Sequence, residues 1–501
     1  MEPAGERSRP TLTGSLSAVG FFSIALGSMI GIGWVTALGS WLRLAGPGGA
    51  ILAFALGGAV MIPIGLCYAE LTAAIPVAGG EVAFAYAAHG SGRAFLVGWF
   101  LAFGYLSVSA FEAISIARVL GYLVPGIDRW PLYELGGSPV FATHLALAAS
   151  LTGLIAWFNY RGGSTAARLQ TILLAAFLLM TGCLVVFGLT RGTAGAVPSW
   201  FGESASGPLA GTLSVFVTAP FWFVGFDTIP QSAEEASSRV SSRQLAGLIV
   251  VSIVAATVFY ALLIFAVALL GDWRQIASSP LATAEAFRMA LDSESAARFV
   301  LMAALFGLLT SWNGFFLAGS RVLFSLGRGA VISKRFGAVH PRYGSPSVAV
   351  VFTAIATLTG AALGPGAMLA FVNVGSLSIA LAFLGVCAST STLRTRLPKL
   401  DRPYRIPAGR TVIAAAFAGA AIVLGALLIP ASPASLRWPV EWMIFGALCV
   451  AGFIVWAAGA ADRGSETEPD RAFAILGETA RLLDRPRSTA SAEPHPESWR
   501  E

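Results

Sequence analysis

Two long apolar segments of this chain are interrupted, at Gly27-Ser28-Met29-Ile30-Gly31-Ile32-Gly33 and at Pro220-Phe221-Trp222-Phe223-Val224-Gly225-Phe226-Asp227. Glycine weakens a helix and proline removes a backbone donor, so each interruption frees peptide groups that lipid cannot hydrogen-bond. The interrupted segments are the first and the sixth along the chain. Broken helices five segments apart predict an inverted five-helix repeat that binds a ligand between the breaks. This pattern is typical of a secondary transporter.

The composition places most of the chain in a lipid bilayer. Of the 501 residues, 56% are hydrophobic and 12% are charged, and the mean hydropathy of +0.75 exceeds that of soluble globular chains. A helix of about 20 apolar residues crosses about 30 Å of hydrocarbon. We therefore expect an all-α integral membrane protein with twelve transmembrane helices, at about residues 17–42, 48–74, 94–124, 140–158, 165–190, 209–232, 245–271, 298–325, 346–365, 367–390, 411–430 and 439–460.

The basic residues of the short loops predict the orientation, because Lys and Arg stay on the cytoplasmic side of a membrane. They concentrate near residues 161–168, 239–243, 321–342 and 394–410, which places both termini in the cytoplasm. The net charge of +6 is then a consequence of orientation, and a nucleic-acid partner is not expected. We expect a multi-pass protein of the plasma membrane.

The chain divides into four parts on this interpretation. They are a cytoplasmic N-terminal segment (1–16), a ten-helix transport core (17–390), a cytoplasmic loop with two further helices (391–460) and a cytoplasmic tail (461–501). The four histidines and four cysteines are scattered, and they form no nucleophile–base pair or metal-ligand spacing. Neither an enzyme nor a bound metal or cofactor is predicted.

Four stretches of the sequence resemble the amino acid-polyamine-organocation (APC) superfamily of transporters. They are Gly27-Ser28-Met29-Ile30-Gly31-Ile32-Gly33, Tyr68-Ala69-Glu70-Leu71 with Pro76-Val77-Ala78-Gly79-Gly80, Phe223-Val224-Gly225-Phe226-Asp227 with Glu234-Glu235, and Arg402-Pro403-Tyr404-Arg405-Ile406-Pro407. They follow one another in the order and spacing of that family. The resemblance implies an amino acid permease with a leucine-transporter-type core of ten helices and two extra helices. It also implies amino acids or related amines as substrates.

The first interruption is expected to bind the carboxylate of the substrate. The substrate-binding candidates there are Gly27, Ser28, Met29, Ile30, Gly31 and Gly33. Backbone N–H groups at the start of a half-helix attract an anion, glycines let it approach the backbone, and a serine adds a hydroxyl group. The alternative is that Gly27 and Gly31 only form a small-residue face for helix packing.

The second interruption is expected to bind the ammonium group. Carbonyl groups released around Pro220 and Gly225 accept hydrogen bonds from a cation. The candidates are Phe221, Trp222, Phe223 and Gly225. The resemblance implies that Phe221 closes over the bound substrate. The alternative for Trp222 and Phe223 is a packed aromatic core.

Two carboxyl groups lie within apolar segments, where charge is unfavourable and often functional. Asp227 follows the second interruption and is the first candidate for loading a proton or binding the substrate amine. A structural partner at the helix end is the alternative for Asp227. Glu112 is the second candidate, and an ion pair with Arg118 is its alternative.

The sequence leaves the coupling ion open. Many proton-coupled relatives have a lysine in the fifth segment, whereas this chain has none between Gln170 and Thr190. Proton coupling through a carboxyl group, sodium coupling and uncoupled exchange remain. Thr310 and Ser311 are candidate sodium ligands, although polar residues in such a helix also bond to neighbouring helices.

The sequence favours a secondary active transporter that moves an amino acid or amine by alternating access, as a proton-coupled symporter or an exchanger. A sodium-coupled symporter and a non-transporting amino acid sensor are the alternatives. A channel is disfavoured, because paired breaks form a closed site for one ligand rather than an open polar pore.

Overall fold

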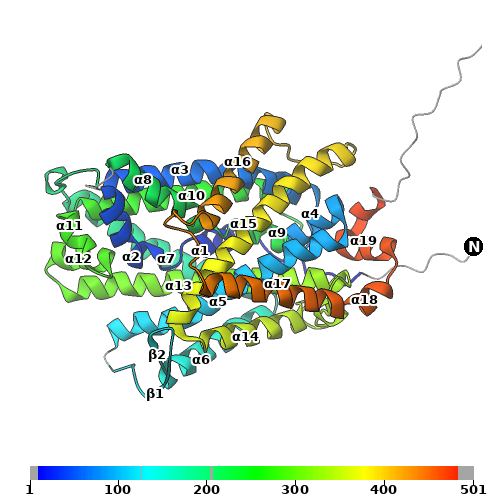
Figure 1. Cartoon of the computed structure of the whole chain (residues 1–501), viewed down its shortest axis with the longest axis horizontal. Helices are drawn as coiled ribbons and strands as arrows, with labels where there is room; N and C mark the ends of the chain where they lie inside the picture. Colours follow the sequence, from blue (N-terminus) through cyan, green and yellow to red (C-terminus); the bar gives the residue numbers. More distant parts are fainter. Residues whose placement is uncertain (1–8, 125, 203–206, 483–501) are drawn as a thin grey trace, which may run out of the picture.

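Long apolar helices make up most of the molecule, as the apolar segments require. The computed structural model describes residues 9–124, 126–202 and 207–482. Among these residues, ten helices are long and apolar enough to cross a membrane. Most of them run roughly along the long axis of the molecule, whereas α15 and α16 cross it obliquely (Figure 1). The remaining residues of the expected N-terminal segment and tail, 1–8 and 483–501, lie outside the described residues.

The elements follow one another along the chain with short connections. The first part contains α1 (Ala18–Met29), α2 (Gly33–Thr36), α3 (Leu38–Ala74), α4 (Gly80–His89), α5 (Ser91–Leu123), β1 (Pro131–Leu135), β2 (Ser138–Phe141), α6 (Ala142–Tyr160), α7 (Gly163–Arg191), η1 (Ala194–Ala196), α8 (Pro208–Thr218), η2 (Ala219–Phe223), α9 (Thr228–Gln231) and η3 (Ala233–Glu235). The second part contains α10 (Ser242–Ala268), α11 (Trp273–Ala277), α12 (Ala282–Leu291), α13 (Glu294–Arg328), η4 (Lys334–Gly337), α14 (Ser347–Ala361), α15 (Gly364–Arg396), α16 (Gly409–Leu428), α17 (Val440–Ala458), α18 (Ala460–Gly464), α19 (Glu468–Leu476) and η5 (Gly477–Leu482).

Two of the twelve expected transmembrane segments fall outside the ten. The segment at 140–158 is the 19-residue α6, whose polar residues His144 and Asn159 lower its hydropathy. The segment at 346–365 is α14, which has 15 residues. Both are helices, so the difference concerns their length and apolar character rather than their secondary structure.

Helix α3 joins the end of the first expected segment to the second. The chain bends at Gly46, where φ is 68°. A side chain at this position would be strained, so glycine permits the bend. The loop before α8 packs on the bend, because Gly202 N donates a hydrogen bond to Ala45 O at 2.8 Å.

A short β-hairpin adds to the all-α fold that the sequence predicts. Strands β1 and β2 pair antiparallel, and Gly136 and Gly137 form the turn with φ of 61° and 71°. Glycine is favoured there because tight hairpin turns require positive φ. The hairpin lies next to the start of α15, where Gly136 O approaches Gly366 closely.

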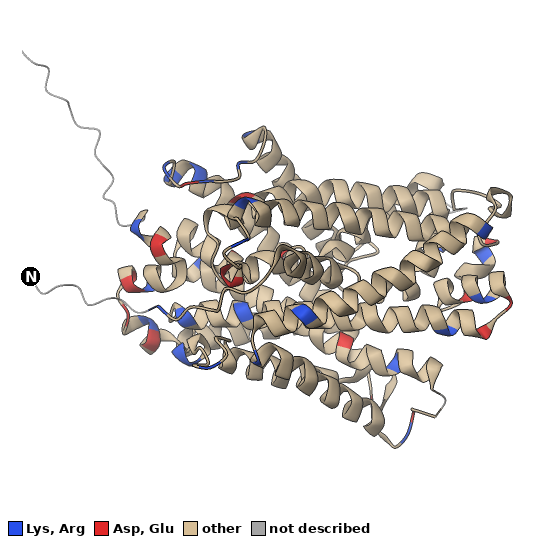
Figure 2. Ribbon diagram, turned by 180° about the vertical axis from the view of Figure 1, so that it is seen from behind, with Lys and Arg blue, Asp and Glu red and all other residues tan. Residues whose placement is uncertain are grey.

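Arg9 and Leu482, the first and last described residues, lie at the same end of the bundle (Figure 1). We call this the terminal end and the opposite one, which carries α11, α12 and the hairpin, the distal end. Lys and Arg residues gather at the terminal end (Figure 2). This asymmetry matches the loops that the sequence identifies as basic.

Glu70 connects two of the stretches that carry the family resemblance. Its side chain is fully buried in α3. Oε1 accepts a hydrogen bond from Nε of Arg394 at 2.8 Å, and Oε2 accepts one from Ile406 N at 2.8 Å. Nε of Arg402 lies 3.3 Å from Oε1. Buried charges need such partners, so Glu70 fixes the loop between α15 and α16 against α3.

Candidate functional site

The first interruption is present between α1 and α2. Helix α1 ends at Met29, and Ile30 leaves the helical conformation with φ of −111° and ψ of 77°. The N–H groups of Gly31, Ile32 and Gly33 find no hydrogen-bond acceptor among the described residues. Three adjacent free donors beside the break are suited to an anion.

The second interruption lies between α8 and α9. A 3-10 turn, η2, replaces the regular helix, and Gly225 adopts φ of 137°, a conformation that side chains disfavour. In the described structure, the carbonyl groups of Trp222, Phe223 and Val224 accept no hydrogen bond. Free carbonyl oxygens are suited to a cation, so the two breaks offer opposite polarity.

The two breaks touch each other directly. A Cβ placed on Gly225 would lie 2.7 Å from Met29 N and 2.8 Å from Cβ of Ser28. Glycine at 225 therefore permits the close approach of the two backbones. Tyr260 of α10 supports the first break from behind, since its hydroxyl donates to Met29 O at 3.0 Å.

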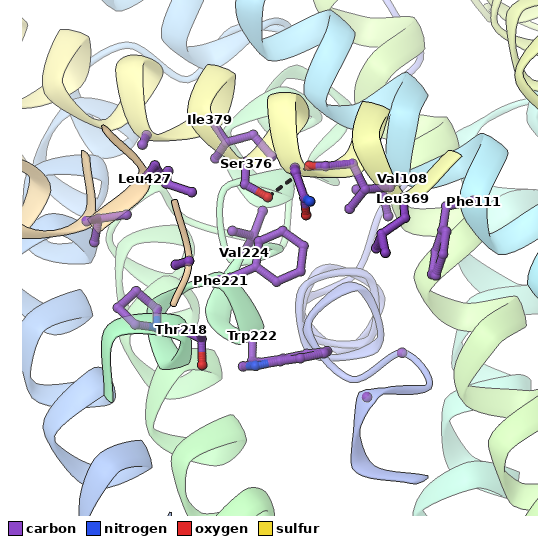
Figure 3. Close-up of a pocket in the computed structure, with 18 of the residues that line it drawn as sticks. Val108, Phe111, Thr218, Phe221, Trp222, Val224, Leu369, Ser376, Ile379 and Leu427 are labelled. Carbon is purple, nitrogen blue, oxygen red and sulfur yellow. Dashed lines mark hydrogen bonds between the residues drawn. The ribbon is translucent and has the colours of Figure 1, made fainter. Parts of the chain in front are cut away.

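A cavity of about 400 Å³ adjoins the two breaks. Figure 3 shows Phe221 and Trp222 within it, with Ser376 of α15 and Val108 and Phe111 of α5 around them. Its wall continues to the loop between α16 and α17, at the distal end. Most of the wall is apolar, which is typical of a site for a small molecule that a few polar groups orient.

The cavity wall includes part of the residue set that the sequence predicts. The predicted residues in the wall are Ser28, Met29, Gly31, Gly33, Phe221, Trp222, Glu112 and Ser311. The predicted residues behind the wall are Gly27, Ile30, Phe223, Gly225, Asp227 and Thr310. The hydroxyl of Ser28 donates to Ile24 O at 2.7 Å, so its hydrogen is directed to its own helix.

Helices α15 and α16 contribute wall residues that sequence reasoning missed. They are Leu369, Val372, Asn373, Ser376, Ile379, Ala380, Phe383, Val423 and Leu427. The only signal was Asn373 and Ser376, two polar residues about one turn apart in an apolar helix. That signal is ambiguous, because polar groups also link helices: Asn373 donates to Oε1 of Glu441 at 2.7 Å.

Glu112 lies in the wall beside the first break. Its side chain is buried, and Oε1 accepts a hydrogen bond from the Ser311 hydroxyl at 2.7 Å. Oε2 has no partner in the described part of the chain. The described residues show no ion pair between Glu112 and Arg118: Arg118 is exposed, whereas Glu112 is buried. Thr310, the other sodium-ligand candidate, donates to a helix carbonyl instead.

Asp227 holds the second break from behind the cavity wall. It is fully buried. Oδ1 accepts a hydrogen bond from Gly225 N at 2.8 Å, and Oδ2 accepts one from the Tyr105 hydroxyl at 2.6 Å. Both carboxylate oxygens are therefore engaged in fixing the break.

Another buried carboxyl group, Glu81, lies near Asp227. It sits in the first turn of α4 and accepts a hydrogen bond from Gln231 Nε2. Burial, with the nearby charge of Asp227 as a further cause, raises the pKa of Glu81 well above its usual range. Sequence alone does not distinguish Glu81, because a glutamate at the start of a helix is an ordinary feature.

Gln170 lies in α7, and its side chain is fully buried. Its Nε2 donates to Ser23 O at 3.1 Å and to Thr310 O at 3.0 Å, so it bridges α1 and α13. Asn313 donates to Oε1 of Gln170 at 2.8 Å, and Asn159 donates to Oδ1 of Asn313 at 3.0 Å. A chain of uncharged amides thus links four helices.

Ion pairs pack the terminal end below the breaks. Arg321 and Glu235 are buried, with Nε 2.7 Å from Oε1. Glu234 binds Arg9 at 3.1 Å and Arg328 at 2.8 Å. Burial raises the pKa of Glu234, but the charges of Arg328 and Arg9 outweigh it and hold this pKa below its usual range. These ion pairs join the N-terminal segment to η3 and η3 to α13.

Comparison with known proteins gives one family and several named relatives. A family model described as amino acid permease matches residues 16–455. The branched-chain amino acid permease BcaP of Bacillus subtilis is 24% identical over 414 residues, which cover 81% of this chain and 85% of the relative. The methylthioribose transporter of the same bacterium is 22% identical over 401 residues, covering 79% and 85%. Cationic amino acid transporter 4 of Mus musculus is 28% identical over 423 residues, covering 79% of this chain and 62% of the relative.

Proposed function

This chain belongs to the amino acid permease family, and from that membership we propose that it is a secondary active transporter of an amino acid or related amine. The family match confirms the resemblance found in the sequence, and it identifies a multi-pass membrane transporter rather than an enzyme. The printed names of the relatives differ in substrate. We therefore infer the chemistry of the ligand from the groups that line the cavity.

The observation that carries the proposal is the opposite polarity of the two breaks. Gly31, Ile32 and Gly33 have free N–H groups, and Trp222 and Val224 have free carbonyl groups among the described residues. A zwitterionic amino acid needs both kinds of partner when it leaves water. The cavity of about 400 Å³ has the size of a small-molecule site, and its apolar wall suits a substrate side chain.

Alternating access follows in this proposal from the unequal ends of the molecule. The cavity reaches the distal end, whereas ion pairs such as Arg321–Glu235 pack the terminal end. The structure then represents the half of the cycle in which substrate enters from the distal side. In the other half, the terminal ion pairs separate and the distal wall around residues 433–437 closes.

A proton or an exchanged substrate is the favoured coupling partner. The two buried carboxyl groups of the sequence analysis, Asp227 and Glu112, remain the candidate proton carriers. Sodium at Thr310 and Ser311 is less favoured, because Thr310 O accepts from Gln170 and the Ser311 hydroxyl donates to Glu112. The uncharged Gln170 bridge lets α1 and α13 remain linked without a bound cation.

The proposed architecture has twelve transmembrane helices, with α6 and α14 counted among them. The broken helix at residues 18–36 and the broken helix at 208–231 then begin two inverted repeats of five. The basic terminal end faces the cytoplasm, and the plasma membrane is the proposed location. This arrangement places the cavity between the first helices of the two repeats.

Counterflow in proteoliposomes tests the proposed function. Vesicles loaded with one unlabelled amino acid are exposed to a trace of the same labelled amino acid, and the standard amino acids are tested in turn. We expect at least one to accumulate transiently, and we expect replacement of sodium by choline to leave its uptake unchanged. Binding without counterflow would instead indicate a sensor. Dependence on sodium would support Thr310 and Ser311 as sodium ligands.

A further inference from the structure

The carboxyl group of Glu112 lies within contact distance of the backbone that is proposed to hold the substrate carboxylate. A Cβ placed on Gly31 would lie 2.9 Å from Oε1 of Glu112 and 3.3 Å from the Ser311 hydroxyl. Ser311 donates to Oε1, whereas Oε2 has no partner among the described residues. Glu112 is only 4% exposed, so no bulk water compensates the unpaired oxygen.

An ionised Glu112 conflicts with a carboxylate on the free N–H groups of residues 31–33. Two carboxylates that share a buried site repel each other, and one of them takes up a proton. A protonated carboxyl group becomes a hydrogen-bond donor. The repulsion then turns into an attraction, because the proton on one carboxyl group bonds to the other.

We propose that Glu112 carries the transported proton and, when protonated, donates a hydrogen bond to the substrate carboxylate held by the N–H groups of residues 31–33. The inference rests on the proposed function. It makes the carboxylate an obligatory part of the substrate. It also links proton binding to amino acid binding without a lysine in the fifth segment.

The surroundings of Glu112 contain few other groups that could take this role. Tyr260 of α10 is close enough to interact electrostatically, but its hydroxyl donates to Met29 O. Arg437 is the other charged residue in the cavity wall, and it belongs to the distal loop before α17. Asp227 lies behind the wall with both oxygens bonded.

The test measures binding of two probes at several pH values. The probes are the amino acid with the largest counterflow signal and the amine formed by its decarboxylation. Between about pH 5.5 and about pH 8.5, affinity for the amino acid should fall by up to about tenfold per pH unit above the pKa of Glu112, since one proton binds with the substrate. The amine should bind weakly and without this fall. This comparison uses the wild-type protein and needs no variant.

The variant Glu112→Gln isolates the proton. An amide has a similar shape and donates permanently, but more weakly than a carboxylic acid. Counterflow should therefore continue at a reduced rate, affinity should no longer depend on pH, and accumulation driven by a pH gradient should disappear. Glu285→Gln, in the partly exposed α12, is the matched control and should keep the wild-type pH profile.

Three results would overturn the inference while leaving the proposed function intact. They are a wild-type affinity for the amino acid that does not fall as pH rises, gradient-driven accumulation by Glu112→Gln, and loss of counterflow in a folded Glu112→Gln protein. Absence of counterflow for every amino acid in the wild-type protein would instead reject the proposed function itself.

Discussion

Gly33 and Trp222 fit together only because position 33 has no side chain. A Cβ on Gly33 would overlap the Trp222 ring, with Cζ3 as the nearest atom. Gly33 begins α2 after the first break, and Trp222 belongs to the turn of the second break. The indole ring therefore closes the gap between two breaks that are far apart in sequence.

The first prediction follows from this contact. Gly33→Ala should lower counterflow strongly, because the added methyl group displaces the Trp222 ring from the cavity wall. Adding Trp222→Leu to Gly33→Ala should restore part of the activity. A double-mutant cycle, which also includes the single variant Trp222→Leu, measures this coupling between the two positions. Gly182→Ala is the control, since a Cβ there meets open space. Equal activity of all three proteins would show that the ring position is unimportant.

The second prediction concerns Asp227. Asp227→Asn should lose one of its two acceptor interactions and destabilise the protein by about 1.5–3 kcal/mol, the contribution of a hydrogen bond to a charged group. Tyr105→Phe should have a smaller effect in the same direction. Counterflow and gradient-driven accumulation should fall together if Asp227 positions the break. A selective loss of accumulation would instead assign the transported proton to Asp227.

The third prediction concerns the buried pair of Arg321 and Glu235. Removing one partner leaves an uncompensated buried charge, so Arg321→Met should destabilise the protein by about 3–5 kcal/mol. Arg288→Met is the control, because the Arg288–Glu285 pair is partly exposed and should matter little. Thermal unfolding in detergent measures both. Similar melting temperatures for the two variants would contradict the role of the buried pair.

The fourth prediction uses the lowered pKa of Glu234. A carboxyl group with a lowered pKa in the folded protein stabilises it above the usual glutamate pKa of about 4.3, and this contribution is lost as pH falls through the folded-state value. Acidification from about pH 5 to about pH 3 should therefore lower the melting temperature of the wild-type protein more than that of Glu234→Gln. Parallel curves for the two proteins would rule out this contribution.

The fifth prediction concerns orientation. Reporter fusions after Leu482 and within the distal loop near Trp273 should report opposite sides of the membrane, with Leu482 on the cytoplasmic side. The physical reason is the concentration of Lys and Arg at the terminal end. A cytoplasmic signal from both fusions would reject the proposed topology.

The sequence by itself determined the helical membrane character and the position of both breaks. Apolar length decides whether a segment crosses lipid, and glycine or proline decides where its helix is interrupted. Both are local properties, so Gly31 and Gly225 could be placed at breaks without a structure. The β-hairpin was not predicted, because the formation of short strands depends on what packs around them.

Only the tertiary structure decided which polar groups meet. Glu112 and Ser311 are 199 positions apart, and Glu70 and Arg394 are 324 positions apart. The choice of partner depends on how helices cross and which faces they bury, and local composition does not encode it. For this reason the sequence ranked Asp227 before Glu112, whereas packing places Glu112 in the cavity wall and Asp227 behind it.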